Sequence, residues 1–198
     1  MPSKSISRRE ILKSLSVSAF AGSVLRVIPA AAAEHAHSMV MEEKKRASGS
    51  YAPKFFSARQ YKTIQALCQA IIPADAEAGG AIEAGAPEFI DLLTSENPEY
   101  QLSLGGGLMW LDSTCIDRNG KAYLDCTPAQ QKEILDLIAY RKNAVADPSV
   151  SQGVEFFAIL RNLTADGFFT SEIGIKYLGY IGNTFLKEFP GCPPVPEA

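Results

Sequence analysis

The sequence is poor in histidine, the residue that most often serves in metal sites and in acid–base catalysis. Both histidines, His35 and His37, lie in a polar, alanine-rich stretch near the N-terminus, and none follows them. The rest of the chain can therefore form no histidine-based catalytic triad, imidazole metal site or histidine-ligated haem. We expect no catalytic, cofactor-binding or metal-binding residues in this chain.

The sequence also lacks the short motifs of metal and nucleotide sites. None of its four cysteines stands in a Cys-x-x-Cys pair, the spacing typical of zinc and iron–sulfur sites. The run Gly105-Gly106-Gly107 has no lysine or hydroxyl of a phosphate loop, and it lies in an apolar, helical stretch. Small residues there favour the close approach of another helix or of a partner.

Positive charge is scarce once the N-terminal segment is set aside. Removing residues 1–33 leaves 14 of the 19 basic and 21 of the 22 acidic side chains, a formal charge of −7. Such a surface offers no basic stripe for a phosphate backbone, so we expect no nucleic-acid partner.

Residues 1–33 have the features of a twin-arginine export signal. The pair Arg8-Arg9 precedes an apolar run over residues 11–28, and a small-residue cleavage site follows at Ala31-Ala32-Ala33. Charged residues and serines dilute the apolar run, which favours an export signal over a retained membrane anchor. This route generally carries proteins that fold before they cross the membrane, so we expect a periplasmic protein.

The remaining chain divides into a linker and one domain. Residues 34–50 are small and charged, with a Ser-Gly pair near their end, and we expect a flexible linker there. Aromatic residues begin at Tyr51, so residues 51–198 are expected to form a single domain.

Apolar residues of this domain recur at helical spacing. Capping boxes begin at Ser57 and Thr127, and Pro87 suits the first position of a helix. Alternating, β-branched stretches are short and scattered. The fold class we predict is all-α: a compact, irregular helical bundle with an extended C-terminal segment rich in glycine and aromatic residues. The helices are expected over about residues 57–72, 87–93, 98–115, 128–140 and 152–165.

The even number of cysteines permits disulfides in an exported protein. Cys115 and Cys126 bracket a short loop between two predicted helices, which makes them the candidate pair. Cys68 lies on the core side of its helix and is expected to be a buried thiol. Cys192 lies in a proline-rich tail, where it could pair with Cys68 or with another chain.

The segment from Leu163 to Pro193 interleaves aromatic residues with glycines. Two interpretations are compatible: the segment wraps its own core, or it binds a partner, because tyrosine and phenylalanine are enriched at interface cores. The candidate interface residues are Phe168, Phe169, Tyr177, Tyr180, Phe185 and Cys192.

Four stretches resemble the gluconate 2-dehydrogenase subunit 3 family. They are "DGFFTSEIGIKYLGYIGN" (residues 166–183), "FPGCP" (189–193), "AIIPAD" (70–75) and "AGAPEFIDLL" (84–93). The resemblance implies the small partner of a flavin-dependent dehydrogenase of the glucose–methanol–choline type. FAD and the substrate would then lie on the large subunit, and a multihaem cytochrome c could serve as a third subunit at the inner membrane. The small subunit would carry the signal read by the Tat translocon and assist maturation and export.

A second hypothesis needs no partner. Scattered carboxylates such as Asp75, Glu77 and Asp166 could serve an independent exported helical binding protein or a small enzyme, although no second functional group stands beside them.

Overall fold

The computed structural model describes residues 29–46 and 49–182, and it is all-α, as the sequence predicts. Within those ranges there is no strand, and no helix is long and apolar enough to span a membrane. The helices are α2 (Ala30–Arg46), α3 (Ala58–Ile71), α4 (Ala86–Glu96), α5 (Pro98–Asn119), α6 (Pro128–Ile138), α7 (Arg141–Ala146), α8 (Ser151–Phe169) and α9 (Glu172–Tyr177), with short 3-10 turns η1 (Tyr123–Asp125) and η2 (Pro148–Val150).

The predicted helix starts are confirmed by their hydrogen bonds. The Ser57 hydroxyl accepts from the Gln60 amide, and the Gln60 side chain accepts from the Ser57 amide at 3.0 Å. Thr127 and Gln130 make the same reciprocal pair before α6. Each box satisfies amide donors that a helix start leaves unpaired, so the local sequence determines where these helices begin.

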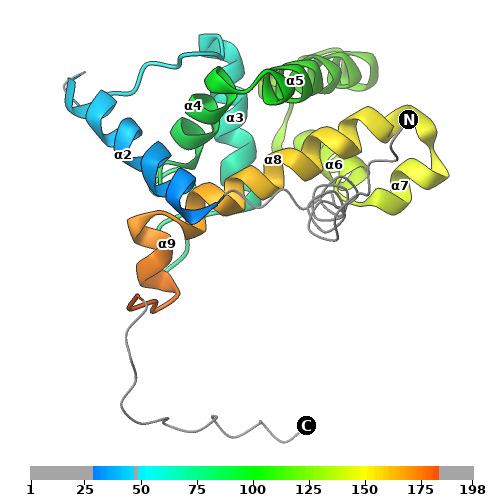
Figure 1. Ribbon diagram of the computed structural model, residues 1–198. Coiled ribbons are helices and arrows are strands. Elements are labelled where there is room, and N and C mark those ends of the chain that lie inside the picture. Colours follow the sequence, from blue (N-terminus) through cyan, green and yellow to red (C-terminus); the bar gives the residue numbers. More distant parts are fainter. Residues whose placement is uncertain (1–28, 47–48, 183–198) are drawn as a thin grey trace, which may run out of the picture.

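Helix α8 runs through the middle of the bundle and packs against α3, α4, α5 and α6 (Figure 1). It crosses α5 at close range: a side chain on Gly107 would overlap Phe156, and one on Gly153 would overlap Trp110. The glycine run therefore does not interrupt α5. Gly107 instead gives the Phe156 ring room against the α5 backbone, as the prediction of close helix approach anticipated.

The flexible linker predicted for residues 34–50 is wrong over most of its length, because residues 30–46 form helix α2. Ala33, Ala36 and Val40 are buried along one side of this helix. Their spacing of three and four residues makes a narrow apolar stripe, which the polar average of the segment conceals. Tertiary packing, rather than hydrophobic content, holds this helix in place.

The extended C-terminal segment is also corrected over its first part. Residues 163–169 continue α8, and residues 172–177 form α9. Glycine does not break α8, because α4 packs tightly against Gly167: a Cβ there would lie 3.0 Å from Phe89 and 3.2 Å from Ala86. Tertiary contact here outweighs the low helix propensity of glycine.

Candidate partner-docking surface

The chain turns sharply where α8 ends and α9 begins. The Ser171 hydroxyl donates to the Phe168 carbonyl oxygen at 2.6 Å and accepts from the Gly174 amide at 3.1 Å, which caps α9. Any side chain on Gly174 would overlap the backbone of Phe168 and Phe169. Gly179, at φ 63°, turns the chain again after α9. Serine and glycine therefore set the direction of α9, which projects from the end of α8 (Figure 1).

This corner concentrates exposed apolar side chains. Of the twelve large hydrophobic residues that are exposed among the residues described, six fall between positions 169 and 181, with exposures from 36 % to 75 %. Singly exposed apolar residues are ordinary on a protein surface, but a contiguous group of them is typical of an interaction site. We call this group the α9 surface: Phe169, Ile175, Tyr177, Leu178, Tyr180 and Ile181.

Three of the residues predicted as interface candidates, Phe169, Tyr177 and Tyr180, lie on the α9 surface. The prediction of a surface position is wrong for Phe168, which is only 3 % exposed. Its ring meets Phe169 edge-on at 5.1 Å and Tyr177 at 6.4 Å, so it supports the surface from beneath. Phe185 and Cys192 lie outside the described residues.

Sequence reasoning missed the aliphatic members of the surface, Ile175, Leu178 and Ile181. They recur every third residue in "IGIKYLGYIG", with Ile175 in α9 and Leu178 and Ile181 in the turn after it. That spacing was readable, but only the structure shows that no other described element covers these side chains.

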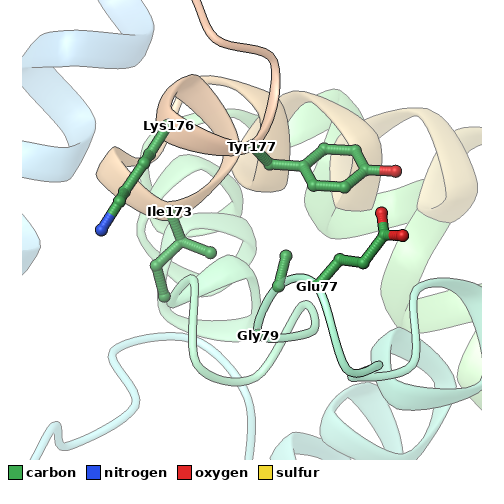
Figure 2. Close-up of a pocket in the computed structure, with 6 residues that line it drawn as sticks. Glu77, Gly79, Ile173, Lys176 and Tyr177 are labelled. Carbon is green, nitrogen blue, oxygen red and sulfur yellow. The ribbon is translucent and has the colours of Figure 1, made fainter.

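A recess of about 480 Å³ adjoins the α9 surface, between α9 and the loop that follows α3. Its lining includes Glu77 and Gly79 from the loop and Ile173, Lys176 and Tyr177 from α9. Figure 2 shows Glu77 and the Tyr177 ring at one side and Lys176 at the other. The recess thus places an acid, a base and an aromatic ring at its edge.

The loop side of this recess has a defined shape. The Asp75 carboxylate accepts hydrogen bonds from the amides of Glu77 and Ala78, both at 2.8 Å. These amides lower the pKa of Asp75. A Cβ on Gly80 would lie 2.5 Å from the Ala74 nitrogen, so only glycine fits there. Asp75 therefore shapes the loop.

The other two carboxylates singled out in the sequence do not meet at one site. Glu77 lines the recess, whereas Asp166 lies on α8 outside the recess lining. Burial raises the pKa of Asp166. Across residues 29–46 and 49–182, no group of three or more histidine, cysteine or acidic side chains is placed to hold a metal ion.

Comparison with protein families matches residues 58–191 to gluconate 2-dehydrogenase subunit 3, well over half of the chain. The chain belongs to the gluconate 2-dehydrogenase subunit 3 family. Comparisons with curated proteins and with solved structures gave no match. The matched range includes the α9 surface and the recess, whereas α2 precedes it.

The structure of this subunit 3 family member also brings the predicted cysteine pair together. Cys115, in the last turns of α5, and Cys126, just after η1, are neighbouring free thiols, and the Cys126 thiol donates to the Lys121 carbonyl oxygen at 3.5 Å. Burial, with the neighbouring Cys126, raises the pKa of Cys115 to about 12. Cys68 is buried as predicted, with its sulfur 3.5 Å from the Thr164 hydroxyl oxygen. The signal residues Arg8 and Arg9 lie outside the described residues.

Proposed function

We propose that this chain is the non-catalytic small subunit of a periplasmic, flavin-dependent dehydrogenase complex, and that it binds the catalytic subunit through the α9 surface. The observation that carries the proposal is the concentration of exposed aromatic and aliphatic side chains at the α8–α9 corner, inside the range matched to the family. Aromatic residues in such a group supply most of the binding energy of protein interfaces.

In this proposal the flavin chemistry belongs to the partner. Membership of a dehydrogenase subunit family implies a complex with a dehydrogenase catalytic subunit. We assign FAD to that subunit, of the glucose–methanol–choline type, and a multihaem cytochrome c is the expected electron acceptor at the inner membrane. The support is that this sequence has no glycine fingerprint for a dinucleotide and no histidine after His37.

The proposal also assigns export to this chain. Arg8 and Arg9 would be read by the Tat translocon, and the catalytic subunit would cross the membrane bound to this chain. A route that carries folded cargo suits a partner that must bind its flavin before export. The small subunit would thereby assist both maturation and translocation.

A matched pair of substitutions tests the interface. Leu178→Asp places a charge on the α9 surface, and Leu102→Asp makes the same change on α5, where Leu102 is 79 % exposed. We expect Leu178→Asp to abolish co-purification of the catalytic subunit with the tagged small subunit, because a buried unpaired carboxylate is costly. Leu102→Asp should leave co-purification intact. Equal retention in both variants would place the interface elsewhere.

Export is tested separately with Arg8→Lys and Arg9→Lys together. We expect the catalytic subunit to remain in the cytoplasm, measured as flavin-linked dye reduction in periplasmic and cytoplasmic fractions. Normal periplasmic activity with this double substitution, or with the small subunit deleted, would refute the escort role. A small subunit that migrates alone in native extracts would favour an independent exported protein.

A further inference from the structure

The peptidase site predicted at Ala31-Ala32-Ala33 does not lie in an open chain. These residues form the first turn of α2, where the amides of Ala32 and Ala33 donate to the Pro29 carbonyl oxygen at 2.9 and 3.0 Å. Ala33 is fully buried, whereas Ala31 and Ala32 are exposed, so the protection of this site comes from its helical backbone and from the docked Ala33. We propose that packing of α2 on the fold shields this site, so that the folded chain keeps residues 1–33 until α2 undocks. The inference rests on the proposed role of those residues as an export signal.

Several contacts hold α2 on the fold. Its buried stripe packs beside α4, where the His37 ring stacks on Phe89 with centroids 4.9 Å apart. Nε2 of His37 also lies 2.9 Å from the Thr170 hydroxyl, at the end of α8. Further along the helix, Lys44 pairs with the largely buried carboxylate of Glu88 at 2.7 Å. An isolated helix of this length is marginal in water, so these contacts stabilise it.

Cleavage at this site requires that α2 is undocked from the fold. A peptidase hydrolyses a peptide bond only where the backbone is accessible and free of internal hydrogen bonds, which is why proteolysis concentrates in exposed, mobile segments. At the Ala33–Glu34 bond, water would add to leave a carboxylate on Ala33 and an amine on Glu34. When opening is fast relative to cleavage, the rate follows the population of the undocked helix. A chain that folds before export would meet the peptidase with α2 already docked.

The experiment uses the full-length chain with its leader and a detergent-solubilised signal peptidase, and follows the N-terminus by intact mass. Val40→Asp disrupts the buried stripe, and its control Met41→Asp makes the same kind of change at a position 57 % exposed. Lys44→Glu sets an acid against Glu88 without touching the core, and Lys45→Glu, at the exposed neighbour, is its control.

We expect Val40→Asp to be cut after residues 31–33 about tenfold faster than the wild-type chain and Lys44→Glu about threefold faster, while both controls match the wild type. Hydrogen exchange of α4 and α8 confirms that each variant keeps its fold. If the wild-type chain is cut as fast as Val40→Asp, or if no variant is cut, the proposal is overturned. Neither result bears on co-purification with the catalytic subunit, so failure here is distinguishable from failure of the proposed function.

Discussion

Asp91 shows how one buried carboxylate organises the segment that precedes α3. It is fully buried on α4, and it accepts hydrogen bonds from the Tyr51 hydroxyl at 2.8 Å and from the amides of Lys54, Phe55 and Phe56 at 2.6–3.2 Å. Burial raises the pKa of Tyr51, and the hydrogen bond to this carboxylate raises it further. A charged acceptor with several donors is the arrangement in which a buried carboxylate is stabilising.

We therefore expect Asp91→Ala to lower the free energy of unfolding by about 4 kcal/mol, because its donors lose their acceptor in the protein interior. Asp91→Asn, which keeps one acceptor oxygen, should cost about 2 kcal/mol. Urea denaturation measures both. Asp136→Asn is the control, since Asp136 pairs with Lys132 at an exposed position and should change stability by less than about 0.5 kcal/mol. Equal effects at positions 91 and 136 would contradict this account.

His37 makes the docking of α2 sensitive to pH. Burial lowers the pKa of His37 below 6.5, so the docked helix favours the neutral ring. The undocked helix binds the proton more readily, and docking is therefore fully stable above pH 6.5 and weakens as the pH falls below it. On the helices packed against α2, Glu88 is paired with Lys44, and Asp166 lies one turn before Thr170.

As the pH falls from about 6.5 to 5, the α2 amides should consequently exchange faster relative to their intrinsic rate at each pH. We call this relative increase the excess exchange. His37→Gln should abolish this excess, and His35→Gln, at an exposed position of the same helix, should not. Asp166, whose pKa burial raises, titrates with the opposite sign, so Asp166→Asn separates the two contributions. An unchanged excess in His37→Gln would rule out this histidine as the titrating group.

The pair of thiols at Cys115 and Cys126 is expected to become a disulfide after export, with a periplasmic thiol oxidase accepting the two electrons. Closing a loop of this length should stabilise the fold by about 3 kcal/mol. Mass spectrometry of the exported protein without reductant measures the bond, and denaturation with and without reductant measures its contribution. Alkylation of both cysteines in unfolded, unreduced protein would contradict the prediction.

At the scale of the element, the crossing of α5 and α8 gives neighbouring glycines opposite roles. A side chain on Gly107 would overlap Phe156, whereas the nearest atom to one on Gly106 would be the Gln152 Nε2 at 3.7 Å, an ordinary contact. Both positions lie within the same helix. Substitutions at these two positions therefore distinguish the effect of packing on stability from the effect of helix propensity.

Gly107→Ala should lower the free energy of unfolding by about 2 kcal/mol, because the α5–α8 crossing must open. Gly106→Ala should raise it by about 0.5–1 kcal/mol, because alanine has the higher helix propensity. Chemical denaturation of the two variants checks both signs. Stabilisation by both substitutions would mean that α5 and α8 do not cross at Gly107.

At the scale of the whole molecule, the proposed function assigns the flavin to the catalytic subunit and not to this chain. The small subunit purified alone should show no flavin absorbance and no dye-linked oxidation of sugars, sugar acids or alcohols, because the proposed function assigns both to the partner. The co-purified complex should show both. Turnover by the small subunit alone would favour the alternative of a small enzyme acting through carboxylates.

Much of the fold was readable because local sequence determines it. Ser57, Pro87 and Thr127 marked the starts of helices, and the spacing of apolar residues indicated which elements form. Family membership could be read from the sequence too, in the stretches at residues 70–75, 84–93, 166–183 and 189–193. Each of these signals is contained in one short stretch of sequence, so no knowledge of distant contacts is needed to interpret it.

Other features depended on contacts between distant segments. The polar average of α2 conceals its apolar stripe. This segment is helical because it packs against α4 and because its His37 contacts Thr170. Phe168 and Phe169 are adjacent and chemically identical, yet packing buries one and exposes the other. The sequence by itself determined the helical class, the starts of α3, α4, α5, α6 and α8 to within a residue, and the family. Only the tertiary structure decided which apolar side chains remain outside the core, because that depends on which helices cover them.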